Sequence, residues 1–190
     1  MEIRQDRALR SMAIVAVPLL VTAALAFGYH RIERLAAPTE AVETSDTTPI
    51  VTRTRYDEMI RSYAERYGVD AALVKAVIYA ESGFHARVRS RCGARGLMQV
   101  MPRTGRAYGA RNLYDPRQNL RAGIRHLRHL LDSHDNDPAL AVAAYNAGAG
   151  AVKAYGGVPP FAETRGYVAK VLRFQRRYQT AAAQAPAPRS

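Results

Sequence analysis

The sequence is poor in cysteine, tryptophan and acidic side chains. Its 190 residues include one cysteine and no tryptophan, and 16 acidic residues stand against 28 lysines and arginines. A single cysteine, Cys92, cannot form a disulfide within the chain, so the fold does not depend on one. The net charge of +12 favours acidic partners, which include nucleic acid, anionic lipid and anionic wall polymers.

The chain also lacks segments that alternate apolar and polar residues over the length of a β-strand. Hydrophobic residues make up 48% of it, which is enough for the core of one ordinary domain. Apolar residues recur at helical spacing, and Asp-Pro pairs have the form of a helix start. We therefore predict an all-α domain, with helices over 57–67, 70–81, 115–131, 137–148 and 162–178. A row of arginines beside the apolar face of the third of these is expected to be a solvated surface.

Residues 11–29 carry no charged side chain and follow a basic N-terminus. The run is long enough for a transmembrane helix, with its basic end in the cytoplasm. The alternative is a signal peptide cleaved after Ala24-Leu25-Ala26, for which the run is long. Both interpretations place the remainder in the periplasm, which argues against nucleic acid as a partner. The cytoplasmic membrane is the expected partner of an uncleaved helix.

Composition divides the chain into four parts. Residues 1–29 form the anchor or signal segment, and residues 30–55, rich in threonine and proline, are expected to be a linker. Residues 56–179 hold the periodic segments and are predicted to be the folded domain. Residues 180–190 form an Ala/Pro tail that is expected to be disordered.

Glu81 is the principal candidate for a catalytic side chain. On a helical wheel it falls within the apolar arc of Leu73, Val74 and Val77. A carboxyl on an apolar face loses solvation, which raises its pKa and lets it hold a proton near neutral pH, as a general acid must. The alternative is a helix-end glutamate that turns out to water.

Several motifs follow Glu81 in a fixed order. Ser82 and Ser90 precede a glycine-rich run, and two further motifs lie near the C-terminal helices. Together they resemble the lysozyme-like soluble lytic transglycosylases over residues 56–178. The matching stretches are Glu81-Ser82, Ser90, Gly93-Ala94-Arg95-Gly96-Leu97-Met98-Gln99-Val100-Met101-Pro102, Ala144-Tyr145-Asn146-Ala147-Gly148 and Glu163-Thr164-Arg165-Gly166-Tyr167-Val168.

This resemblance implies a lysozyme-like fold and cleavage of peptidoglycan glycan strands. The bond cut would be the β-1,4 bond from N-acetylmuramic acid to N-acetylglucosamine. Glu81 would act first as acid and then as base, while the 6-hydroxyl of the sugar attacks its own anomeric carbon and leaves a 1,6-anhydro end. The family needs no cofactor, and we expect no metal site and a monomer.

The resemblance also implies roles for other positions. Ser90 would hydrogen-bond near the substrate acetamido group or Glu81, and Met98 and Gln99 would line the sugar subsites. Tyr145 and Asn146 would contact the reacting sugar or orient Glu81. Glu163 and Tyr167 would complete the groove. Met98 and Tyr145 could instead be core residues, and Glu163 could be a glutamate favoured by the helix dipole.

Two other function classes stay open from the sequence. A peptidoglycan hydrolase of similar fold would need a second carboxylate to activate water, for which Glu163 is the candidate. A non-catalytic peptidoglycan-binding module would not need an intact Glu81. The enzyme could serve wall turnover or open the wall locally for a secretion or conjugation apparatus.

Overall fold

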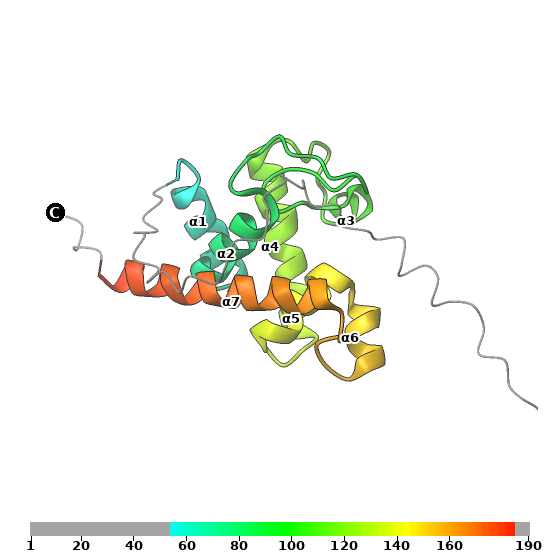
Figure 1. The fold of residues 1–190 in the computed structure, drawn as a ribbon. Helices are drawn as coiled ribbons and strands as arrows, with labels where there is room; N and C mark the ends of the chain where they lie inside the picture. Colours follow the sequence, from blue (N-terminus) through cyan, green and yellow to red (C-terminus); the bar gives the residue numbers. More distant parts are fainter. Residues whose placement is uncertain (1–53, 185–190) are drawn as a thin grey trace, which may run out of the picture.

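The computed structural model describes residues 54–184, which form an all-α domain (Figure 1). The expected segments at 1–29, most of the linker, and residues 185–190 of the tail lie outside the described residues. Two isolated β-bridges, Arg89–Arg95 and Arg95–Val100, are the only sheet-like pairing within 54–184. The helices are α1 (Asp57–Tyr67), α2 (Ala71–Ser82), α3 (Pro102–Ala107), α4 (Pro116–Asp132), α5 (Pro138–Ala147), α6 (Ala149–Tyr155) and α7 (Ala162–Ala183).

Aspartates begin three of the helices as predicted. The side chains of Asp70, Asp115 and Asp137 each accept backbone N–H bonds from the first turn of α2, α4 and α5. These bonds satisfy donors that a helix start otherwise leaves unpaired. At the other end of α2, Gly83 adopts a left-handed conformation with φ 56° and stops the helix directly after the Glu81-Ser82 pair.

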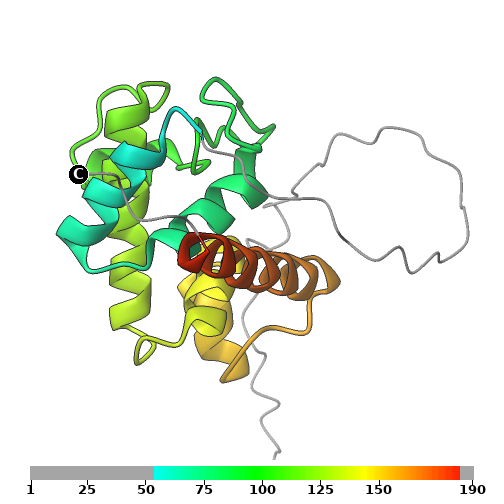
Figure 2. The ribbon, with the colours of Figure 1, turned by 90° about the vertical axis from the view of Figure 1, so that its left-hand side faces the viewer.

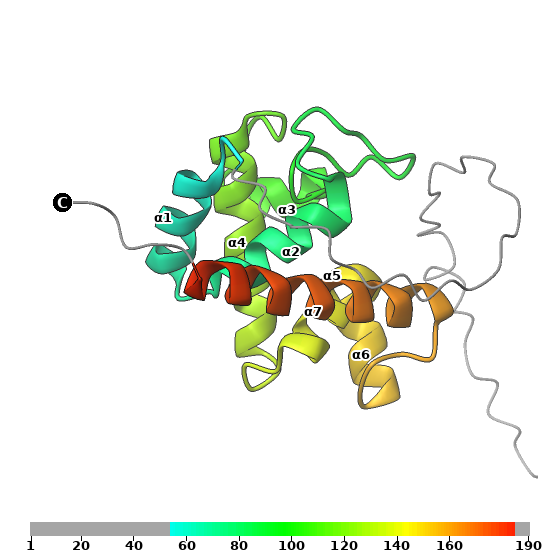
Figure 3. The same cartoon turned by 60° about the vertical axis from the view of Figure 1, so that its left-hand side comes forward.

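Helix α7 crosses one side of the domain and packs along α2 and α5 (Figures 1 and 3). The carboxylate of Asp70 accepts hydrogen bonds from the amides of Gln175 and Gln179 at 2.8 and 2.7 Å. This contact ties the C-terminal half of α7 to the start of α2. The helix continues to Ala183, so the prediction that it ends at residue 178 and that a disordered tail starts at 180 is wrong for residues 180–183.

Two short helices were not predicted. Helix α3 has the sequence PRTGRA and α6 has AGAVKAY, and neither is long enough to show an apolar period. Gly148, with φ 88°, separates α5 from α6 and redirects the chain. In Figure 2, α1 lies beside α4.

The core is continuous and includes residues from most of the helices. Val74, Val77 and Ile78 of α2 are fully buried, as are Leu120 and Ile124 of α4. The apolar face of α2 therefore lies against α7, α1 and the loop that follows it. None of the helices within 54–184 combines the length and hydropathy that a membrane crossing requires.

Candidate active site

Glu81 lies in the last turn of α2 and faces α7. The hydroxyl of Tyr167 donates a hydrogen bond of 2.7 Å to Glu81 Oε1. Burial raises the pKa of Glu81 to about 7, against the lowering effects of the Tyr167 hydrogen bond and the positive charge of Lys170. A carboxyl with its pKa raised this far can both donate and accept a proton near neutral pH.

The glycine-rich loop, residues 83–101 between α2 and α3, is held in place by buried polar contacts. Ser82 Oγ donates to the carbonyl of Leu97 at 2.7 Å, which fixes the loop to the helix end that carries Glu81. The side chain of Asn119, fully buried on α4, accepts from the N–H of Met98 at 2.9 Å. Its amide also donates to the carbonyls of Arg95 and Leu113. Asn119 thus binds three backbone groups outside the helices, of which the Arg95 carbonyl also accepts from the N–H of Val100.

Gln99 has an unusual backbone and a buried side chain. Its φ of 46° is rare for a residue other than glycine, and only 6% of it is exposed. The side-chain amide donates to the carbonyls of Val88 and Gly96 at 3.1 and 2.9 Å. Both donors are used within the loop, so the side-chain oxygen is the group that remains to meet a ligand. Such strain is maintained only where the surrounding contacts fix the residue.

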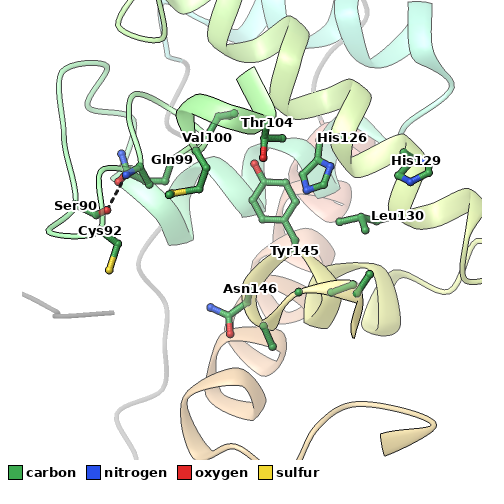
Figure 4. A pocket seen from close by; sticks show the side chains of 16 residues that line it. Ser90, Cys92, Gln99, Val100, Thr104, His126, His129, Leu130, Tyr145 and Asn146 are labelled. Atoms are coloured by element: carbon green, nitrogen blue, oxygen red, sulfur yellow. Dashed lines mark hydrogen bonds between the residues drawn. The ribbon is translucent and has the colours of Figure 1, made fainter. Parts of the chain in front are cut away.

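A pocket of about 310 Å³ opens between this loop and helices α4 and α5. Its size falls within the range of ligand pockets in proteins. Figure 4 shows the loop residues Ser90 and Gln99 on one side and His126 and His129 of α4 on the other, with Tyr145 and Asn146 of α5 between them. Side chains on its wall include Ser90, Gln99, Thr104, His126, Tyr145 and Asn146.

The hydrogen-bonded pair of Glu81 and Tyr167 does not line that pocket. The two features are joined through α7. Thr164 Oγ1 donates to Asn146 Oδ1 at 2.9 Å, and Thr164 lies one helical turn before Tyr167. The pocket wall and the residue that binds Glu81 are therefore fixed to the same face of α7.

Tyr145 and Met98 contact each other through a hydrogen bond that the sequence did not predict. The Tyr145 hydroxyl donates to the carbonyl of Met98 at 2.8 Å, and its ring packs near His126. The Met98 side chain is fully buried and packs against Gly123, where an added Cβ would lie 2.5 Å from its sulfur. The prediction that Met98 lines a sugar subsite is wrong for its side chain, because that side chain is buried in the core.

Ser90 lies on the wall of the pocket, whereas Glu163 lies outside it. Ser90 is on the pocket wall, and its hydroxyl accepts from the N–H of Ala94 at 3.0 Å, which closes the turn between them. Glu163 is exposed in the first turn of α7, four residues before Tyr167 and so on the same face of the helix. It does not line the pocket.

The sequence did not single out His126 or Thr104, and Thr164 was marked only as a member of a motif with no role assigned. His126 packs between Tyr108 and Tyr145, and burial together with the charge of His129 lowers its pKa, which favours the neutral imidazole. Helical spacing places it beside the apolar face of α4, but no motif marks it. Within residues 54–184, no group of three histidine, cysteine or acidic side chains is arranged to hold a metal ion.

Comparisons with known proteins find a matching family profile and several similar proteins. The family profile described as Transglycosylase SLT domain matches residues 58–167. A transglycosylase of Enterobacteria phage PRD1 is 38% identical over 116 residues, which is 61% of this chain and 41% of the phage protein. The soluble lytic murein transglycosylase of Escherichia coli K12 is 30% identical over 147 residues, 65% of this chain and 23% of the relative.

A solved structure shows the same fold. The inactive mutant of lytic transglycosylase Slt from Pseudomonas aeruginosa, in which a glutamate is replaced by glutamine, superposes with a TM-score of 0.61 at 30% identity. The match covers 70% of this chain and 25% of that one. The chain thus spans less than half the length of each of these proteins.

Proposed function

The chain belongs to the Transglycosylase SLT domain family, and on that premise we propose that it is a peptidoglycan lytic transglycosylase. Its substrate is the glycan strand, cut at the β-1,4 bond between N-acetylmuramic acid and N-acetylglucosamine. We assign the activity to residues 56–179. The observation that supports this most strongly is the Glu81 carboxyl, whose pKa is raised to about 7 and which Tyr167 binds from α7.

The reaction uses Glu81 twice. Protonated Glu81 gives its proton to the glycosidic oxygen, and the bond from that oxygen to the anomeric carbon breaks with development of oxocarbenium character. The resulting carboxylate then takes the proton of the muramic 6-hydroxyl, whose oxygen forms the new bond to the anomeric carbon. Glu81 ends protonated, as it began, and no water is consumed. A pKa near 7 suits both half-reactions.

The pocket supplies the binding contacts in this proposal. The side-chain oxygen of Gln99, the hydroxyl of Ser90 and the amide of Asn146 offer polar contacts on its wall. Tyr145 holds the loop through the Met98 carbonyl and gives an aromatic surface for a sugar face. Glu163, exposed near Tyr167, extends the polar surface along α7.

The test is product analysis on sacculi with the Glu81→Gln variant. We expect loss of 1,6-anhydro products by about 10²–10⁴-fold, the usual contribution of a general acid–base. Glu58→Gln, which changes an exposed glutamate on α1, is the matched control and should retain activity. Glu163→Gln separates the alternatives. Reducing ends that depend on Glu163 would indicate a hydrolase, and no products from the wild type would indicate a binding module.

We further propose that the domain works in the periplasm, tethered by residues 11–29 to the inner membrane or released after signal cleavage. The relatives include a protein of Pseudomonas putida described as membrane-bound lytic murein transglycosylase F. A cytoplasm-dependent reporter fused after Ser45 should be silent, and an active one would overturn this topology. Service to a secretion or conjugation apparatus, and action as a monomer, remain part of the same proposal.

A further inference from the structure

A second pocket lies on the other side of the glycine-rich loop from the active site. It has a volume of about 290 Å³ and is lined by Arg95, Arg106 and Arg111, with Pro102, Ala110 and Leu113 as its apolar part. Ala94, the neighbour of Arg95, lines the active-site pocket instead. Since consecutive side chains of extended backbone point to opposite faces, the loop forms a wall between the two pockets.

The three arginines line one pocket, and none of them forms an ion pair with a described carboxylate. They come from the loop, from α3 and from the segment before α4, so the fold and not local sequence brings them together. Within residues 54–184, the only ion pairs are Lys75–Asp57 and Arg128–Asp132, so no carboxylate pairs with any of the three. Like charges that share a small cavity repel one another, and the repulsion falls when an anion enters.

Arg95 also has an unsatisfied group. Its Nε is buried and has no hydrogen-bond partner, while its guanidinium lies 5.7 Å from the centre of the Tyr114 ring. Buried donors are nearly always paired, so an unpaired one points to a missing partner. The ring contact restrains the guanidinium plane, which favours the bidentate geometry by which arginine holds oxyanions.

We propose that this arginine pocket, formed by Arg95, Arg106 and Arg111, is a binding site for a phosphate group. A phosphate brings three acceptor oxygens and a charge of about −1.5 to −2 at pH 7, which suits three guanidinium groups better than the single charge of a carboxylate. The group can be a free phosphate or the phosphodiester of a lipid headgroup or wall polymer. The site is separate from the chemistry at Glu81 and does not depend on the proposed transglycosylase activity.

Calorimetric titration of the full chain at constant ionic strength tests this. One arm uses inorganic phosphate, and the other uses glycerophosphoglycerol, the deacylated headgroup of phosphatidylglycerol. We expect saturable binding of at least one probe. A preference for the diester identifies a lipid or polymer source, and a preference for inorganic phosphate identifies a free one. Failure of both probes to bind overturns the proposal.

Two variants and a matched control locate the site. Arg106→Gln and Arg111→Gln change exposed side chains and should each weaken binding by about tenfold or more, the effect of one charge-assisted hydrogen bond. Arg103→Gln removes the same charge from an exposed position of α3 that does not line the pocket, and should change affinity by no more than about twofold. Equal losses in all three variants would show diffuse charge attraction and would overturn the site.

Discussion

At the scale of single residues, the half-buried Glu81 makes stability depend on pH. Its folded pKa of about 7 lies above the ordinary value of 4.5, so the folded state holds the proton more tightly than the unfolded state. Ionising Glu81 therefore costs stability, and this cost grows as pH rises from about 4.5 to about 7 and is constant above.

Glu81→Gln should remove that cost. We expect the variant to be more stable than the wild type above pH 7, by up to about 3 kcal/mol, and to lose its advantage below pH 4.5. Urea unfolding at several pH values measures the difference. Glu58→Gln provides the comparison, because Glu58 is exposed. A variant less stable than the wild type at pH 8 would show that the carboxylate contributes favourable contacts.

Tyr167→Phe should shift the pH dependence of the reaction. The Tyr167 hydroxyl donates to Glu81 Oε1 and lowers the pKa of that carboxyl, so its removal raises the pKa above about 7. The alkaline limb of the kcat/KM profile, where the acid loses its proton, should then move to higher pH. The rate should fall by about 10–100-fold, since one buried hydrogen bond positions the acid. An unmoved limb would mean that the Tyr167 contact does not set the protonation of Glu81.

At the scale of elements, the sequence predicts helices where local chemistry decides them. Asp70, Asp115 and Asp137 mark helix starts because each side chain binds N–H groups of the turn that follows. The end of α7 was missed because Gln179 is held by Asp70, a partner 109 residues away. The local sequence pattern therefore does not predict that contact.

The basic row on α4 shows the same limit. It was expected to be a solvated face, and Arg117 and Arg125 are exposed, but three of its four arginines also bind backbone carbonyls of other segments. Arg121 donates to Gly109, and Arg128 donates to Gly68 and forms an ion pair with Asp132. These arginines satisfy carbonyls at turns that have no helix partner. The spacing of the arginines predicts which face of α4 they occupy. It does not predict which segments of the chain lie against that face.

The candidate site was predictable in part. The wheel placed Glu81 on the apolar face of its helix, and burial does raise its pKa. Tyr167 lies 86 residues from Glu81, so only the resemblance to a family indicated it. The sequence could not tell that the core takes the Met98 side chain, because an apolar residue in a loop suits a groove or a core equally well.

The loop that carries Gln99 should be sensitive to substitution of Gly96. This glycine has φ 76°, and an added Cβ would lie 2.2 Å from the Leu113 carbonyl oxygen and 2.3 Å from Asn119 Nδ2. We expect Gly96→Ala to destabilise the fold by about 2–4 kcal/mol, through backbone strain and loss of the Asn119 hydrogen bonds. Denaturant unfolding measures the loss.

Gly93→Ala is the matched control for that substitution. Gly93 also has a positive φ, of 89°, but an added Cβ would meet nothing within 4 Å. Gly93→Ala should therefore lower the free energy of unfolding only by the backbone strain of a non-glycine residue at positive φ, about 1–2 kcal/mol. Equal losses at both positions would mean that the close approach of the Gly96 backbone to Asn119 contributes nothing to stability.

At the scale of the whole molecule, part of the excess positive charge lies on the loop beside the site. The net charge is +12, and three exposed arginines, Arg87, Arg89 and Arg91, follow Glu81 on the loop that leads to the pocket wall. Within residues 54–184 none of the three forms an ion pair. Such a row attracts anionic polymers over distances set by the ionic strength.

Salt should therefore weaken binding to sacculi more than it slows turnover of short soluble glycans at saturation. Replacing Arg87, Arg89 and Arg91 by glutamine should reduce both sacculus binding and its dependence on salt. The same change should leave saturated turnover nearly unaltered, because these side chains are exposed and do not line the pocket. Sedimentation with purified sacculi and assays on short glycans over a salt series measure the two effects. If turnover fell as much as binding, the arginines would belong to the reaction site rather than to the field that brings the substrate to it.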